Sequence, residues 1–193
     1  LMVLLKSGGV FYGGLLLAVP VAWWYIRKHA LPLWTICDLF APGIALGHAV
    51  GRLGCLMAGC CYGRATDLPW GITFTNTLAA ANVGTPLEIA LHPTQVYEAI
   101  AELTVLAVLL VGERRWRPFA GRTFWTYLLL YPTARFFIEF YRGDPRGMLL
   151  GTISTSQVLS GLIVPLAIVM LLRLGRRGKP ESAPAKSAQK KAA

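Results

Sequence analysis

The fold is decided by residues 33–57, which read LWTICDLFAPGIALGHAVGRLGCLM. Crossing about 30 Å of hydrocarbon takes roughly 20 helical residues at about 1.5 Å each. The stretch is long enough to cross, and most of its side chains are apolar. It therefore predicts a transmembrane helix.

Further apolar blocks flank this stretch at about 10–26, 96–111, 123–141 and 153–174. Of the 193 residues, 55% are hydrophobic and 15% are charged, whereas soluble domains carry about 25% charged residues. A soluble domain of this size needs more polar surface to cover its core. We expect an all-α fold, a polytopic transmembrane helix bundle with about five spans in residues 1–176. Residues 177–193 are rich in Pro, Ala and Lys and are expected to form a disordered basic tail.

The basic residues gather after alternate apolar blocks. The clusters are Arg27, Lys28 and His29; Arg114, Arg115, Arg117 and Arg122; and Arg173, Arg176, Arg177, Lys179, Lys186, Lys190 and Lys191. If each block spans once, all clusters share one side, which the positive-inside rule assigns to the cytoplasm. The C-terminus is then cytoplasmic, and segments 58–95 and 142–152 face outward. Because the charges lie between spans, the net charge of +10 indicates membrane anchoring and not nucleic-acid binding.

Four arginines break the charge pattern. Arg52 and Arg135 lie inside apolar blocks, toward their outer ends, and Arg64 and Arg142 lie close by on the outer side. An arginine within a span costs about 2.5–3.5 kcal/mol on insertion scales, so it usually faces a cavity or a partner. Two at similar depth favour a shared anionic ligand such as a phospholipid phosphate. The alternative is internal pairing of Arg135 with Glu139, and of Arg142 with Glu139 or Asp144.

Polar side chains also recur along the fourth block. Tyr131, Arg135, Glu139 and Arg142 follow one another at helical spacing. This stripe is expected to face the bundle interior, because a polar stripe facing lipid is implausible. His48 and Arg52 are likewise one turn apart.

Several segments, in this order, resemble the bacterial prolipoprotein diacylglyceryl transferase family. They are Gly8–Gly14, Gly51-Arg52-Leu53-Gly54, Tyr62-Gly63-Arg64 with Asp67–Gly71, His92–Glu98, Arg135–Arg142 and Ser156-Gln157. The resemblance covers about residues 6–172. Because that family has seven spans and this chain begins at Leu1 and not at Met, the chain is expected to lack the first two.

The resemblance implies transfer of the diacylglyceryl group from phosphatidylglycerol to a lipobox cysteine of a preprolipoprotein, releasing glycerol 1-phosphate. It implies a multi-pass monomer of the bacterial inner membrane, with the active site toward the outer leaflet and neither cofactor nor metal. The implied catalytic residues are Arg52, Arg135, Glu139, Tyr12 and His92. The implied phosphatidylglycerol-binding residues are Arg52, Arg135, Tyr131, Arg142 and Gly63.

The chain departs from the family pattern at three positions. Tyr12 stands where the family commonly has a histidine proposed as base, Cys55 where it has asparagine, and Cys60 where it has glutamate. Glu139, His92 or water would then act as the general base, or the positive charge of the arginines would activate the substrate thiol. The alternative function is a non-catalytic phospholipid-binding protein, or a related transferase with an altered reaction. A transporter is less favoured, since we find no inverted repeat in the sequence.

Three cysteines gather at the outer end of the second block. The default expectation for Cys55, Cys60 and Cys61 is packing in a tight loop. A disulfide, Cys55–Cys60 or Cys55–Cys61, is the alternative in an oxidising compartment. A metal site with His48 or His92 is not expected, because the spacing is not a standard zinc pattern.

Overall fold

The computed structural model describes residues 10–116, 119–144, 148–149 and 153–177. For residues 10–16 and 148–149 it describes the backbone only. The chain divides into two units, Leu1–Ile36 and Cys37–Ala193. From residue 178 onward, the predicted disordered tail lies outside the described residues.

The first unit contains helix α2, Val10–Lys28, which ends with Arg27 and Lys28 in its last turn. The Arg27 guanidinium lies 4.5 Å from the ring centroid of Trp23, and the Lys28 ammonium lies 4.7 Å from that of Trp24. Stacking of cations on aromatic rings suits the end of a membrane helix, where tryptophans are enriched.

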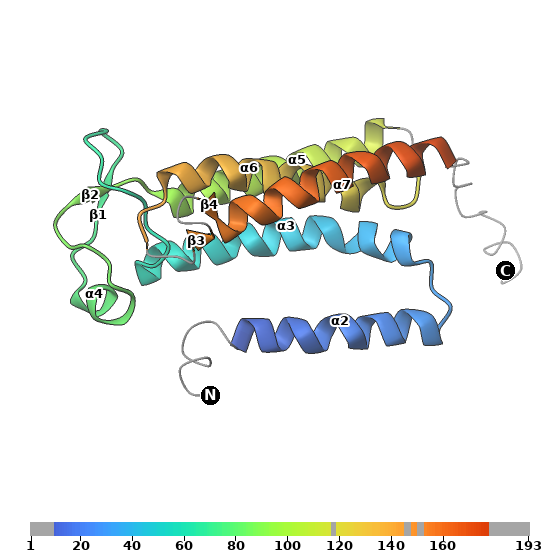
Figure 1. Cartoon of the computed structure of the whole chain (residues 1–193), viewed down its shortest axis with the longest axis horizontal. Helices are drawn as coiled ribbons and strands as arrows, with labels where there is room; N and C mark the ends of the chain where they lie inside the picture. Colours follow the sequence, from blue (N-terminus) through green and yellow to red (C-terminus); the bar gives the residue numbers. More distant parts are fainter. Residues whose placement is uncertain (1–9, 117–118, 145–147, 150–152, 178–193) are drawn as a thin grey trace, which may run out of the picture. The chain divides into compact units, whose positions relative to one another are not determined.

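The second unit is built on long helices. They are α3 (Leu33–Ala58, most of which lies in this unit), α5 (Thr94–Arg115), α6 (Arg122–Ile138) and α7 (Thr155–Arg177). Figure 1 shows β1, β2 and α4, which belong to the connection between α3 and α5, at one end of this unit, the loop end. Helices α3, α5 and α7 are long and apolar enough to cross a membrane, whereas α6 has 17 residues. Three spans are therefore supported by length and composition in the described part of the chain.

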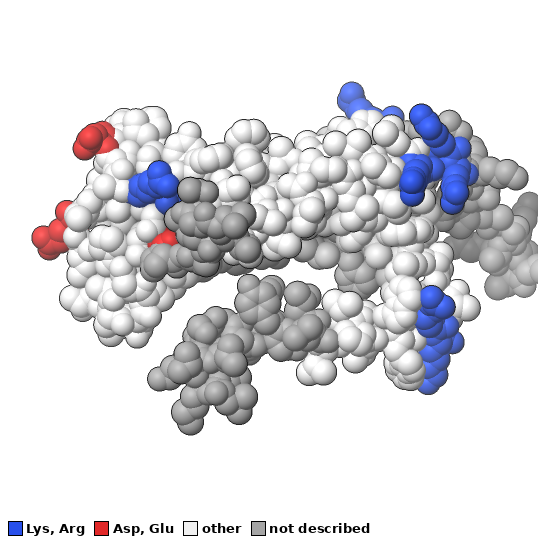
Figure 2. All heavy atoms as spheres, in the orientation of Figure 1, with Lys and Arg blue, Asp and Glu red and all other residues white. Residues whose placement is uncertain are grey.

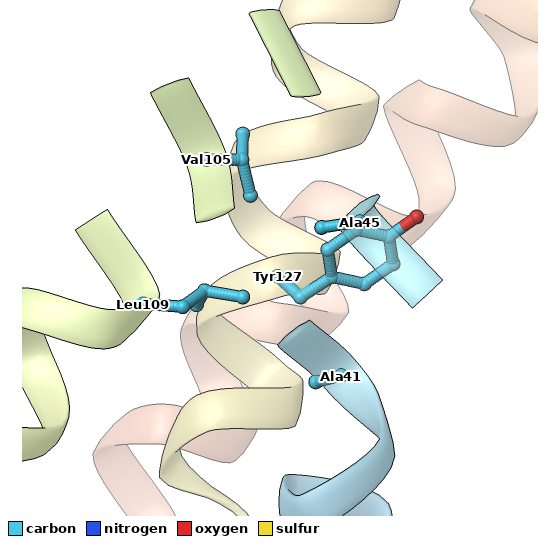
Figure 3. Close-up of a cluster of buried hydrophobic side chains, with 5 residues drawn as sticks. All are labelled: Ala41, Ala45, Val105, Leu109 and Tyr127. Carbon is cyan, nitrogen blue, oxygen red and sulfur yellow. The ribbon is translucent and has the colours of Figure 1, made fainter. Parts of the chain in front are cut away.

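The apolar core of this unit joins three helices. Ala41 and Ala45 of α3 pack against Val105 and Leu109 of α5 and Tyr127 of α6 (Figure 3). Alanines at the interface let the helix backbones approach closely, as is usual between membrane helices. Large apolar side chains point outward elsewhere, for example on α7 at Leu159, Leu162 and Leu166. That arrangement suits a lipid environment.

Helix α6 begins against a carboxylate from α3. The Asp38 oxygens accept hydrogen bonds from the backbone amides of Gly121 at 2.6 Å and Phe124 at 2.8 Å. The first amides of a helix have no partner within the helix, so a carboxylate there is stabilising. The Asp38 contact thereby fixes the start of α6 on α3.

Helix α7 begins with a capping box. Ser154 Oγ accepts from the Gln157 amide at 3.2 Å, and Gln157 Oε1 accepts from the Ser154 amide at 3.1 Å. This reciprocal pair satisfies two amides at the start of the helix. The Ser156-Gln157 element of the family resemblance thus includes a residue that caps a helix.

The loop end carries short elements that the sequence analysis did not predict. Helix α4, Thr77–Val83, is capped by Asn76, and strands β1 (Ile72–Thr73) and β2 (Ala90–Leu91) pair antiparallel. Strands β3 (Met148–Leu149) and β4 (Ile153–Ser154) form a second pair. The all-α expectation therefore holds for the long elements, while the loops satisfy their backbone groups through small ladders.

Charge is distributed unevenly along the second unit. The last turns of α5 and α7 carry Arg114, Arg115, Arg176 and Arg177. Figure 2 shows most of the basic side chains of this unit at that end, with acidic ones at the opposite, loop end.

Candidate active site

A buried carboxylate on α5 organises the site. Glu98 is 1% exposed, and guanidinium groups from three segments contact it. Arg135 Nη1 lies 3.0 Å and Arg142 Nη1 3.1 Å from Glu98 Oε1. Arg52 Nε contacts the other oxygen, Oε2. One carboxylate thus draws α3, α6 and the segment after α6 together.

Two more carboxylates complete this group. Glu139 Oε2 lies 2.6 Å from Arg135 Nη2. Asp144 accepts two hydrogen bonds of 2.9 Å from Arg142, through Nε and Nη2. We call Arg52, Glu98, Arg135, Glu139, Arg142 and Asp144 the Glu98 cluster. Its three arginines balance its three carboxylates, and the internal pairs Arg135–Glu139 and Arg142–Asp144 that the sequence left open are both formed.

The helical part of the predicted polar stripe ends at Tyr141, the last residue of the predicted fourth block, so Arg142 lies beyond the helix. Helix α6 ends at Ile138, a 3₁₀ turn covers Glu139–Tyr141, and Arg142 has an extended backbone. Arg142 nevertheless reaches the same carboxylate as Arg135, because its backbone is held by a bridge to Gly63.

Gly63 makes this bridge possible. A Cβ at Gly63 would lie 2.5 Å from both the Cβ and the carbonyl oxygen of His92, and 2.8 Å from the Tyr141 carbonyl oxygen. Backbone segments around residues 63, 92 and 142 therefore pass in direct contact, which only glycine permits. The structure shows Gly63 in a packing role, and its predicted lipid contact stays a prediction.

A second acid–base pair lies one helical turn along α5. His48 Nδ1 is 2.6 Å from Oε1 of Glu102, whose side chain has no exposed surface. The Tyr131 ring meets the His48 ring edge-on at 4.8 Å and stacks on Tyr127 at 5.8 Å. In the described part of the chain Tyr131 makes no hydrogen bond to Arg135, and its predicted binding of phosphatidylglycerol stays a prediction.

The three outer cysteines converge beside the Glu98 cluster. The sulfur atoms of Cys55, Cys60 and Cys61 all lie within 4.8 Å of one another, and none of the described cysteines is in a disulfide. Arg52 Nη1 lies 3.7 Å from Cys61 Sγ. A hydrogen bond with Cys55, opposed by burial and assisted by Arg142 and Arg52, lowers the pKa of Cys61 to about 5.

His92 belongs to a separate aromatic pocket. Its Nδ1 lies 3.1 Å from the Tyr97 hydroxyl, which accepts a hydrogen bond of 2.8 Å from Trp70 Nε1. The cavity has a volume of about 500 Å³ and is lined by Leu68, Trp70, His92, Tyr97, Phe137, Ile138 and Tyr141. When Nδ1–H donates to Tyr97, Nε2 is an acceptor, which is the form that a general base requires.

The structure thus brings some predicted site residues together and separates others. Arg52, Arg135, Glu139 and Arg142 meet in the Glu98 cluster. Among the described residues no hydrogen bond or ion pair joins His92 to that cluster. The side chain of Tyr12 lies outside the described residues.

Sequence reasoning did not assign Glu98 as the centre of the site. A signal for it was available, because Glu98 and Glu102 are acidic residues four apart near the start of an apolar block. The argument that singled out arginines within spans applies equally to carboxylates.

Comparison with known proteins shows which family the chain is similar to. A family model described as prolipoprotein diacylglyceryl transferase matches residues 1–173. The phosphatidylglycerol–prolipoprotein diacylglyceryl transferase of Clostridium tetani is 40% identical over 156 residues, which is 81% of this chain and 60% of that protein. Those of Geobacter sulfurreducens and Vibrio parahaemolyticus are 37% and 35% identical over 89% of this chain. These two matches cover 64% and 61% of the respective proteins, so the chain spans about three fifths of the length of the curated relatives it matches.

Proposed function

Because the chain belongs to the prolipoprotein diacylglyceryl transferase family, we propose that it transfers the diacylglyceryl group of phosphatidylglycerol to the lipobox cysteine of preprolipoproteins. The cysteine sulfur forms a bond to the terminal glycerol carbon of the diacylglyceryl group. The bond from that carbon to the phosphate oxygen breaks, so glycerol 1-phosphate leaves as a dianion, and the thiol proton passes to a base. The site must therefore hold a phosphate, accept a proton and admit a lipid.

The observation that carries this proposal is the convergence of Arg52 and Arg135 on Glu98 from separate helices. Their side chains are 15% and 7% exposed, so they act in a low-dielectric environment. Arg52 contacts Glu98 through Nε and Cys61 through Nη1. Because a guanidinium has five N–H donors in all, donors remain for a phosphate oxygen. Fixed cations of this kind stabilise charge that develops on a leaving phosphate.

The charge balance of the cluster bears on the proton. The charges of the three arginines and the three carboxylates already cancel. A bound phosphodiester therefore adds one negative charge to the site, and its cleavage to a dianion adds a second. A cluster carboxylate is then a suitable acceptor for the thiol proton, and we assign this role to Glu139, which contacts Arg135. His92, in its aromatic pocket, and Tyr12 stay as the other candidates that the resemblance implies.

We propose that α2, α3, α5, α6 and α7 are about five spans of a monomer in the bacterial inner membrane. The basic last turns of α2, α5 and α7 would lie in the cytoplasm by the positive-inside rule. Arg52 and Glu98 lie close to the loop end of their helices, which supports a position of the Glu98 cluster toward the outer leaflet. Phosphatidylglycerol and the lipobox peptide are the proposed partners, and no cofactor is invoked.

Glycerol phosphate release tests this function. The purified protein is mixed with phosphatidylglycerol vesicles and a lipobox peptide, and both released glycerol phosphate and lipidated peptide are measured. Arg52→Ala should lower the rate by more than a hundredfold, because it removes a phosphate ligand. Arg114→Ala removes an exposed arginine at the other end of α5 and should leave the rate within twofold.

The outcomes separate the transferase from its alternatives. Lipidated peptide and glycerol phosphate in equal amounts support the proposed reaction. Binding of phosphatidylglycerol by the wild-type protein without either product would instead indicate a non-catalytic phospholipid-binding protein. Equal rates in the two arginine variants would remove the Glu98 cluster from the mechanism.

A further inference from the structure

The three outer cysteines form a group that the proposed transfer reaction does not use. Cys55 lies near the end of α3, and Cys60 and Cys61 follow in the loop after it. Their sulfur atoms lie within 4.8 Å of one another, and all three residues are partly exposed. The fourth cysteine, Cys37, is remote in sequence at the opposite end of α3. Convergence of three thiols from a helix end and a loop calls for an explanation beyond packing.

The backbone around these thiols is fixed by neighbouring groups. The Cys60 carbonyl accepts a hydrogen bond of 2.7 Å from Gln95, and the Cys61 carbonyl accepts one of 2.8 Å from Thr94. The Cys60 amide donates to the Cys55 carbonyl at 3.1 Å. Because Thr94 and Gln95 are fully buried at the start of α5, they hold the loop on a rigid element. A ligand set built this way needs little reorganisation on binding.

The spacing of the sulfur atoms suits a metal ion. Three sulfurs separated by at most 4.8 Å surround their centre at no more than about 2.8 Å, and a zinc–thiolate bond is about 2.3 Å. Each sulfur therefore has to move by at most about 0.5 Å to reach that bond length. Thiolate ligands select soft or borderline cations such as Zn²⁺ and Cu⁺ over Mg²⁺ or Ca²⁺.

The charges around the group also favour such a site. Three thiolates with one divalent cation carry a net charge of −1. Arg52 Nη1 lies 3.7 Å from Cys61 Sγ, so a guanidinium is in place to offset that charge. Outer partners that donate to ligand atoms typically strengthen metal binding.

From these observations we propose that Cys55, Cys60 and Cys61 form a three-thiolate site for a thiophilic divalent cation of the Zn²⁺ class. A fourth ligand position would be open to water, as in zinc sites with three protein ligands. The site lies beside the Glu98 cluster but does not depend on the proposed transfer reaction. Arg52 contacts both, so it links them physically.

Cadmium titration tests the proposal with a readout independent of enzyme activity. The purified protein, kept reduced with a phosphine, is titrated with Cd²⁺ while thiolate-to-cadmium charge-transfer absorption is followed. One ion per chain should bind, and Cd²⁺ should displace bound Zn²⁺, because thiolate ligands prefer the softer cation. Cys60→Ser should weaken binding by more than tenfold, whereas Cys37→Ser serves as the matched control and should leave it unchanged.

Alkylation of the wild-type protein gives a second measurement that needs no variant. Bound Zn²⁺ should protect Cys55, Cys60 and Cys61, but not Cys37, from iodoacetamide, as read by mass spectrometry of peptides. Absence of stoichiometric binding by the reduced protein overturns the proposal. So does binding that survives replacement of all three cysteines by serine, or protection that does not distinguish them from Cys37.

Discussion

Glu98 determines how the arginines of the site can act. A buried arginine without a partner is strongly unfavourable, and Glu98 serves Arg52, Arg135 and Arg142 at once. The carboxylate therefore fixes three guanidinium groups in one place while using only some of their donors. In the proposed reaction the role of Glu98 is to position the arginines, and the arginines bind the phosphate.

Removing the charge of Glu98 should destabilise the protein. Glu98→Gln leaves three arginines facing two carboxylates, and breaking a buried ion pair typically costs about 3–5 kcal/mol. Glu102→Gln, one turn away, should have a smaller effect, because one partly exposed partner, His48, contacts Glu102, whereas three arginines contact Glu98. Thermal unfolding in detergent measures both variants. A Glu102→Gln shift as large as that of Glu98→Gln would contradict the central role of Glu98.

Arg135→Lys tests geometry at constant charge. Arg135 bridges two carboxylates, with Nη1 at 3.0 Å from Glu98 and Nη2 at 2.6 Å from Glu139. A lysine ammonium is a single point and cannot maintain both contacts while binding a phosphate. We expect a rate of glycerol phosphate release at least tenfold lower, with the protein still folded. Turnover near the wild-type rate would show that only the charge matters.

At the residue scale the sequence predicted the arginines and left open their pairs with Glu139 and Asp144, but it did not assign Glu98. Arg52 and Arg135 were identifiable because an arginine within an apolar block needs a reason. Their shared partner was not assigned, because residues joined at Glu98 lie far apart in the chain, for example 44 positions for Arg142. Pairing of this kind depends on which helix faces meet, and no single helix pattern contains that information.

Among the elements, the long helices were predictable and their ends were not. Helix α5 runs from Thr94 to Arg115, beyond the predicted block 96–111, because the helix continues through its polar ends. Helix α6 instead stops at Ile138, where the chain turns so that Arg142 can bridge to Gly63. Helix α4 and the two-residue strands are too short to show a hydrophobic periodicity of their own, and each strand pairs with another strand in the same connection between helices.

The start of α7 offers a prediction at the element scale. Ser154→Ala removes the oxygen that accepts from the Gln157 amide, and loss of such a cap costs about 0.5–2 kcal/mol. Ser154→Thr keeps a capping hydroxyl and should retain most of the stability. Thermal unfolding in detergent distinguishes the two. An alanine variant as stable as the threonine variant would show that the box contributes nothing to α7.

At the scale of the whole molecule, the net charge of +10 is informative through its placement. The basic last turns of α5 and α7 lie opposite a loop end that carries acidic groups (Figure 2). Lipid-facing apolar surface covers the helices between these ends. An apolar band with one basic rim has a preferred direction in a membrane, because cationic rims are retained on the cytoplasmic side.

Cysteine labelling in intact cells tests that direction. In a background with serine at the native cysteines, Asn82→Cys places a thiol on exposed helix α4, and Arg177→Cys places one at the exposed basic end of α7. A membrane-impermeant maleimide should label Asn82→Cys from outside and should label Arg177→Cys only after the membrane is permeabilised. The reverse pattern would put the Glu98 cluster on the cytoplasmic side. The proposed reaction takes place toward the outer leaflet, so that reversal would contradict the proposed orientation of Arg52 and Arg135.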